Sequence, residues 1–238
     1  MDEFSYIDIF ATKGIEYLII ITFLVLLIPF WIILNQNDKI VKQIKKVIGN
    51  LSFNMLRIPQ GLFYSKNHTW MHMEKTGTAK LGLDDLLMHI TGEVKFSHLK
   101  NPGDKVTKGD LLAEIDQSDK NLRIFSPVSG KIVATNTTML SHPEILSDDP
   151  YGNGWIYRIK PSNWMSDVKS CYFADDATNW SARELERFKD FVSVSMRNCS
   201  SDPSMVIMQD GGELVDHSLS AFPEGVWKNF EEEFLTLS

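Results

Sequence analysis

The sequence contains little cysteine and no excess of positive charge, and both shortages exclude classes of protein. Two cysteines, Cys171 and Cys199, are too few for a disulfide framework, and they lack the C-x-x-C spacing of a structural zinc site. The 24 basic residues against 31 acidic ones give a formal charge of −7, which argues against general binding to nucleic-acid phosphates. No serine stands in a G-x-S-x-G setting. With 43% apolar and 23% charged residues, the composition predicts a globular protein. The motifs of the sequence offer no catalytic constellation, so we do not expect an enzyme.

The longest apolar run covers residues 17–34, which carry no charge. Eighteen helical residues would extend roughly 27 Å, close to the hydrocarbon thickness of about 30 Å. A signal peptide is the alternative, but the residues before the run are mainly acidic and no small-residue cleavage site follows. The pattern therefore predicts one transmembrane helix.

Lysines concentrate after this run. The positive-inside rule places residues 1–16 outside the cell and everything after residue 38 in the cytoplasm, so we expect a single-pass protein of the cytoplasmic membrane. Residues 35–61 then predict a basic juxtamembrane helix and a linker. The basic face of that helix either is solvated or lies along anionic headgroups.

Residues 62–165 show a different pattern, in which short runs of alternating apolar and polar residues are separated by glycine and proline turns. Asp84 or Asp85 can cap a short helix that stops near Gly92. The polar string QSDKN, residues 117–121, suits the tip of a β-hairpin. The pattern predicts a mainly β fold, either a small sandwich or a flattened barrel.

Five strings in this region carry a resemblance to a known family: YSKNHTW, LGLDDLLMHITGEVKF, PGDKVTKGDLLAEI, FSPVSGKIVATN and HPEILSDDPYGNGWIYRIKPSNW. In this order they resemble the glycine-cleavage H protein, a member of the wider lipoyl/biotinyl carrier fold. The resemblance implies a carrier and not a catalyst. A lysine at the hairpin tip would be amide-linked to lipoate, and the arm would carry an aminomethyl group between a decarboxylase, an aminomethyltransferase and a dihydrolipoyl dehydrogenase.

The chain departs from the family at that lysine. Counted back from the Ser126-Pro127 pair, the family's lysine position falls on Asp119, and its acidic residue falls on Asp116. An aspartate cannot form the lipoyl amide. Lys120 follows one position later and is either a solvated turn lysine or a displaced attachment site.

Residues 166–238 predict a small α-rich extension. Ser181 and Glu184 have the spacing of a capping box, followed by an apolar helical stripe. Residues 204–209 predict a strand or buried extended piece, and Pro223 is placed to begin a second helix with Trp227 on its apolar face and Glu231–Glu233 opposite. The apolar faces either pack on the β domain or receive a partner subunit.

Two histidines have candidate metal-ligand spacing, His68 and His72. We predict no metal site, because a strand would place both side chains on one face at a greater distance than helical ligands have.

The sequence thus predicts a membrane-anchored, unlipoylated docking or scaffold subunit without a cofactor. The alternative is a lipoyl carrier modified on Lys120. The predicted partners are the lipid bilayer and a membrane redox or glycine-cleavage-like complex, and no nucleic acid.

Overall fold

The computed structural model describes residues 17–29, 50–199 and 214–236. The chain divides into two compact units, Met1–Gly49 and Asn50–Ser238. The predicted extracytoplasmic segment 1–16, the part of the juxtamembrane helix before residue 50 and the extended piece 204–209 lie outside the described residues.

In the first unit, residues 17–29 are helical. Among the described residues we find no helix with the length and apolar character needed to cross a membrane. The prediction of a transmembrane helix over 17–34 is therefore wrong, as is the single-pass localisation that depended on it, and the predicted bilayer partner is left without support.

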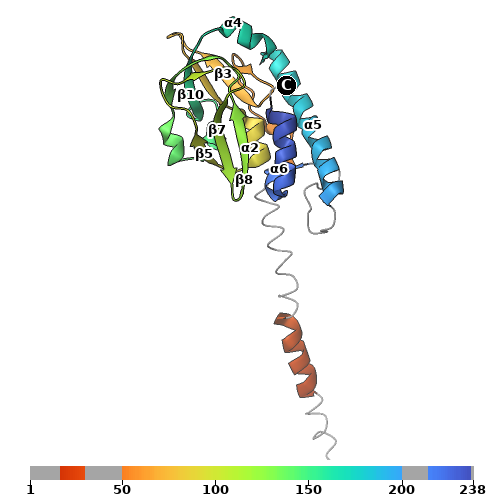
Figure 1. Ribbon diagram of the computed structural model, residues 1–238. Coiled ribbons are helices and arrows are strands. Elements are labelled where there is room, and N and C mark those ends of the chain that lie inside the picture. The colour runs from red at the N-terminus through yellow and green to blue at the C-terminus, as the bar shows by residue number, and fades with distance from the viewer. Residues whose placement is uncertain (1–16, 30–49, 200–213, 237–238) are drawn as a thin grey trace, which may run out of the picture. The chain divides into compact units, whose positions relative to one another are not determined.

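The second unit contains two larger antiparallel sheets (Figure 1), as the predicted mainly β fold requires. The seven-stranded sheet has the order β11-β2-β3-β4-β10-β9-β6, and the three-stranded sheet has the order β5-β7-β8. The strands are β2 (Phe63–Tyr64), β3 (Thr69–Met73), β4 (Ala79–Leu83), β5 (Lys95–His98), β6 (Lys105–Val106), β7 (Leu111–Gln117), β8 (Lys120–Phe125), β9 (Gly130–Thr135), β10 (Trp155–Pro161) and β11 (Tyr172–Phe173).

Short helices connect these strands. They are η1 (Phe53–Met55), α2 (Asp85–Thr91), η2 (Thr137–Leu140), α3 (Ile145–Asp148), α4 (Trp164–Asp167) and η3 (Val168–Ser170). The helix α2 confirms the predicted short helix, because the Asp84 carboxylate accepts a hydrogen bond from the Leu87 amide at 2.8 Å and so caps it. Gly92 ends it with φ of 77°, and a Cβ there would lie 2.8 Å from the His217 ring.

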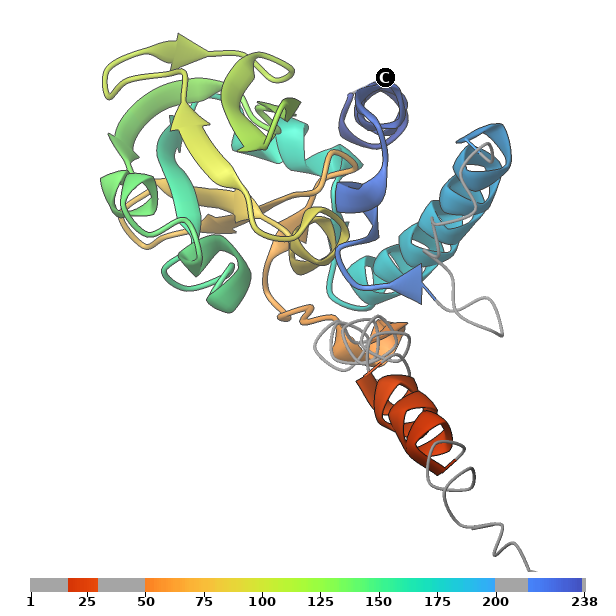
Figure 2. The same cartoon turned by 90° about the horizontal axis from the view of Figure 1, so that it is seen from below.

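The predicted α-rich extension is present. It consists of α5 (Asp175–Cys199), η4 (Ser218–Ala221), α6 (Glu224–Phe230) and the π-helix η5 (Glu231–Leu235). A short strand of the extension, β12 (Leu214–Val215), pairs with β1 (Asn50–Leu51). Figure 2 shows α5 and the C-terminal helices together on one side of the β structure.

The extension shares its core with the β domain, so the prediction that its apolar faces pack there is confirmed. One continuous cluster of buried side chains includes Leu122 and Ile124 of β8, Phe188 of α5, and Trp227 and Phe230 of α6. The rings of Phe188 and Phe230 meet edge to face with centroids 5.7 Å apart. The β domain and the extension are therefore one structural unit.

The predicted capping box is wrong. The helix α5 begins at Asp175, so Ser181 lies inside it and is buried. Asp175 and Asp176 stand in the first turn, where negative charge favours the helix N-terminus. Glu184 turns instead toward the β domain.

Candidate functional site at the β7–β8 hairpin

The hairpin of β7 and β8 ends in a two-residue turn, as the string QSDKN predicts. Gln117 pairs with Lys120 across the turn, which consists of Ser118 and Asp119. Ser118 has φ of 57°, and positive φ is typical of residues in such tight turns. The Gln117 amide fixes the hairpin to the end of α2 by donating to the Thr91 carbonyl at 2.8 Å and the Glu93 carbonyl at 3.0 Å.

Asp119 lies at the tip of this hairpin and is exposed. Its carboxylate makes the tip acidic, and it offers no amine for an amide bond. The position predicted for the lipoyl lysine of the family therefore lies at the tip of the hairpin, but it holds a carboxylate, which cannot form an amide with lipoate.

The Lys120 side chain lies against the extension. Its Nζ donates a hydrogen bond to the Ser220 carbonyl at 2.7 Å and stands 5.4 Å from the centroid of the Trp227 ring. Lys120 is half-buried, and this burial lowers the pKa of its amine. Lys120 thus has the chemistry needed for lipoate, but in this structure its amine is engaged.

One residue pair holds the extension to the same strand. The Glu231 carboxylate accepts hydrogen bonds from the Arg123 backbone amide at 2.8 Å and from Arg123 Nε at 2.7 Å. This interaction raises the pKa of Arg123. Since β8 is an edge strand of its sheet, the carboxylate satisfies a backbone donor that would otherwise be open to another chain.

The sequence reasoning missed Ser220 and Glu231 as neighbours of the hairpin. Glu231 was predicted on the polar face of the last helix, but only 7% of it is exposed. The reason is the π-helical turn at this point together with the cationic partner on β8. The aromatic face that includes Trp227 was the one signal available in the sequence, and Trp227 is fully buried as that face predicts.

The other candidate residues do not form a site. His68 is fully buried and precedes β3, whereas His72 is exposed on β3, so the two do not share a face as predicted. Among residues 17–29, 50–199 and 214–236, no group of three or more His, Cys, Asp or Glu side chains could hold a metal ion. Burial raises the pKa of the Cys171 thiol to about 11, which keeps it protonated at neutral pH.

Comparison with known proteins decides the family. The model of the glycine cleavage H-protein family matches residues 62–182, just over half of the chain. The chain belongs to the glycine cleavage H-protein family. The match ends within α5, so Arg183 and everything after it lie outside the matched region.

Several relatives of this family are similar to the same part of the chain. The glycine cleavage system H protein of Psychrobacter cryohalolentis is 34% identical over 125 residues, which cover 52% of this chain and 98% of the relative. The H protein of Cronobacter sakazakii is 37% identical over 109 residues, covering 46% and 84%. The crystal structure of an H protein from Mycobacterium marinum matches at 25% identity with a TM-score of 0.46, covering 52% and 98%.

The family model and the curated relatives confirm the resemblance that the five strings predicted. They favour the carrier alternative over the scaffold prediction, because the relatives carry the name of the H protein itself. The region beyond residue 182 has no counterpart in the family match, and this region supplies Ser220, Trp227 and Glu231.

Proposed function

We propose that this chain is a lipoyl carrier of a glycine-cleavage-type system and that lipoate is attached to Lys120. Membership of the H-protein family supports the carrier role. Lys120 supplies the primary amine next to the hairpin tip, and an amide forms there when the lipoate carboxyl condenses with that amine and water leaves. The partners would be the enzymes of such a system.

The contact with Ser220 does not prevent this use of Lys120. A hydrogen bond from an ammonium group to a carbonyl has a net value of about 1.5–3 kcal/mol, so thermal motion breaks it in a small fraction of molecules. The lysine stem has several rotatable bonds, and Lys120 itself is only half-buried. The amine can therefore leave the extension without unfolding it.

A second candidate is a docking subunit that carries no lipoate. The observation that favours it is the exposed carboxylate of Asp119 at the hairpin tip, together with the engaged amine of Lys120. Such a protein would present the H-protein fold to partners but transfer no group. The two candidates differ at one atom. Nζ of Lys120 is acylated by lipoate in the carrier and is free in the docking subunit.

Mass spectrometry of the intact chain, purified from its native cells, separates these candidates. We expect one lipoyl adduct, located by fragmentation to Lys120, because this amine is the one nearest the hairpin tip. Lys120→Arg should lose the adduct completely, whereas Lys108→Arg, a control on another turn, should retain it. An unmodified native protein would contradict the carrier proposal and support the docking subunit.

The variant Asp119→Lys tests the hairpin itself. If the native chain is unmodified but Asp119→Lys accepts lipoate, the hairpin is recognised and the residue at its tip decides the outcome. That result would assign the docking role to this chain.

A further inference from the structure

The strands of the seven-stranded sheet carry basic charge without acidic charge. Among the residues that the structure assigns to these strands, there are four lysines and one arginine but no aspartate or glutamate. The basic residues are Lys80, Lys105, Lys131, Arg158 and Lys160. The whole chain has 31 acidic residues and a formal charge of −7, so the basic sheet is a local feature and not a property of the whole molecule.

The lysines of this sheet point away from the core. Along β10, Ile159 is buried and Lys160 is exposed, and along β9, Ile132 is buried and Lys131 is exposed. Both isoleucines belong to the same buried cluster as Leu122 of β8. Because successive side chains of a strand point to opposite faces, the lysines lie on the outer face of the sheet, on the side away from the β7–β8 hairpin.

Three of the lysines form a row across neighbouring strands. Lys131 of β9 is directly opposite Lys105 of β6 on one side and Lys160 of β10 on the other. All three side chains are exposed, and none has an ion pair or hydrogen bond to another side chain within the described ranges. The Cβ atoms of directly opposite residues are about 4.5–5.5 Å apart, and like charges at that spacing destabilise a sheet. The fold therefore contains a repulsion that no described residue relieves.

Protection of the sheet edge explains only part of this row. A lysine on an edge strand prevents pairing with another chain, and Lys105 on the edge strand β6 is placed for that role. The strands β9 and β10 have neighbours on both sides, so Lys131 and Lys160 protect no edge.

The acidic residues that follow or precede these strands do not compensate the row. The Glu74 carboxylate, just after β3, lies 3.7 Å from Lys80 Nζ and 3.7 Å from Arg158 Nη2, so it partly compensates those two cations. The Asp104 carboxylate, just before β6, accepts a hydrogen bond from the Asn101 amide at 2.8 Å and closes its own turn.

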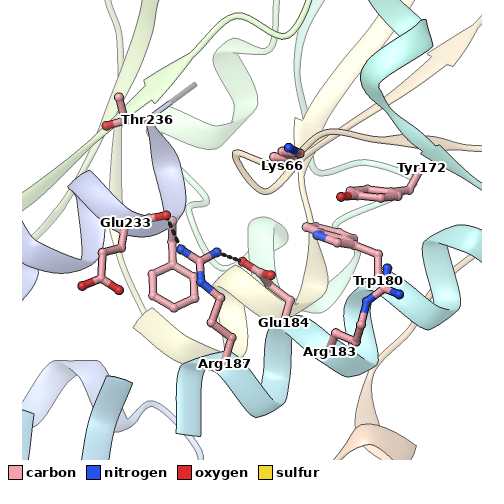
Figure 3. A pocket seen from close by; sticks show the side chains of 9 residues that line it. Lys66, Tyr172, Trp180, Arg183, Glu184, Arg187, Glu233 and Thr236 are labelled. Carbon is pink, nitrogen blue, oxygen red and sulfur yellow. Dashed lines mark hydrogen bonds and ion pairs between the residues drawn. The ribbon is translucent and has the colours of Figure 1, made fainter. Parts of the chain in front are cut away.

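Arg187 of α5 shows how a cation is used inside this fold. Its Nη1 lies 2.7 Å from the Glu184 carboxylate, and its Nη2 donates a hydrogen bond to the Glu233 carbonyl at 2.5 Å (Figure 3). These contacts join α5 to η5. The lysine row makes no such contact with a described residue, so its charge is available to a partner.

We propose that the outer face of the seven-stranded sheet binds an acidic helix of a partner protein, with Lys105, Lys131 and Lys160 at the centre of the contact. Carboxylates three or four residues apart on a helix have Cβ atoms about 5–6 Å apart, which is close to the spacing of the row. Pairing with them would relieve the repulsion between the lysines and fix the register of the helix.

A compact acidic helix fits this face better than a nucleic acid does. A long polyanion would also approach the acidic remainder of a chain with a formal charge of −7, whereas a helix contacts the basic face alone. Because the face points away from the hairpin, a protein bound there would leave Lys120 accessible. The inference therefore goes beyond the carrier proposal and does not depend on it.

Fluorescence anisotropy of labelled probes, titrated with the full chain at low salt, tests this proposal. The probes are a synthetic helix with glutamates on one face, the same helix with lysines in their place, and a single-stranded oligothymidylate. We expect saturable binding of the glutamate helix that weakens as salt is added, weaker binding of the oligonucleotide, and no binding of the lysine helix.

The variant Lys105→Gln/Lys131→Gln/Lys160→Gln should weaken binding of the glutamate helix roughly tenfold, because it removes three exposed ion pairs. Its melting temperature should equal or exceed that of the unsubstituted chain, since the variant removes the repulsion between opposite lysines. A purely structural role of the lysines would lower the melting temperature instead.

The matched control is Lys66→Gln/Lys95→Gln/Lys169→Gln, which removes the same charge from three exposed lysines outside the row. We expect it to bind the glutamate helix almost as the unsubstituted chain does. An equal loss of affinity in both triple variants would show that only the net charge matters, and it would overturn the proposal.

Other results would also overturn it: no saturable binding of the glutamate helix, oligonucleotide binding that is at least as tight, or a lower melting temperature of the row variant. A salt-sensitive dimer of the full chain that the row variant abolishes would assign the face to a second copy of this chain instead. None of these measurements depends on lipoylation, so the proposal can fail while the carrier function stands.

Discussion

Replacing Trp227 with alanine is expected to lower the free energy of unfolding by about 3–5 kcal/mol. The indole is fully buried, and its Nε1 donates a hydrogen bond to the Leu219 carbonyl at 2.8 Å. Its removal would leave a cavity between α6 and β8 and would break this hydrogen bond. Urea unfolding followed by circular dichroism measures this change.

The matched control is Phe173→Ala on β11. This ring is 44% exposed, so we expect a loss well below that of Trp227→Ala. Because the extension and the β domain share one core, both variants should unfold residues 50–238 in a single transition. A loss below 1 kcal/mol in Trp227→Ala, or a separate early transition of the extension, would contradict the shared core.

The stability of the protein should fall by about 3 kcal/mol as the pH rises from 6.5 to above 9, through His68. Burial by itself would lower the pKa of His68, but Asp84, 2.9 Å from Nδ1, and the more distant Glu184 together raise it to about 9. The folded state therefore keeps a proton that the unfolded state releases above pH 6.5. This contribution is complete below pH 6.5 and is lost as the pH rises through 9.

His89 also makes the stability fall as the pH rises. Hydrogen bonds that the His89 ring donates to the carboxylates of Asp216 and Asp85 raise the pKa of His89 to about 9, against a smaller opposing effect of burial. Urea unfolding at a series of pH values between 6 and 10 measures the slope of the free energy of unfolding against pH, to which both histidines contribute. His68→Gln should reduce that slope by about half, whereas His72→Gln, at an exposed position, should leave it unchanged.

A stability that stays flat between pH 7 and 9 would contradict the charged state of both histidines. If His68→Gln does not fold, Glu184→Gln offers a second test. It removes one of the two carboxylates that hold the His68 proton, and it should reduce the slope to a smaller extent.

Local signals predicted the β domain well because its elements depend on near neighbours in sequence. The helix α2 needs only Asp84 to begin and Gly92 to end, and the β7–β8 turn needs only the polar residues at its tip. The five strings also predicted the family, and the family model matches the same region of the chain. The location of Asp119 at the hairpin tip follows from the same spacing.

Predictions that depended on distant partners were less successful. The spacing of Ser181 and Glu184 is that of a capping box, but both residues are buried within a helix that begins earlier, at Asp175. The sequence predicts a solvated Glu231, but in the folded chain it pairs with Arg123, which lies more than a hundred residues earlier in the sequence. The apolar run of residues 17–34 suggested a membrane span, but no helix in the described part of the chain is long and apolar enough to cross a membrane.

The sequence by itself determined the β scaffold, the hairpin, and the aspartate that stands where an amine is expected, because each is encoded in residues a few positions apart. Only the tertiary structure decided what surrounds the hairpin: the Ser220 carbonyl on the Lys120 amine and the Glu231 carboxylate on β8. These features arise where α5 and the last helices pack on strands far away in the sequence. Their energy comes from burial and charge pairing, which no local pattern records.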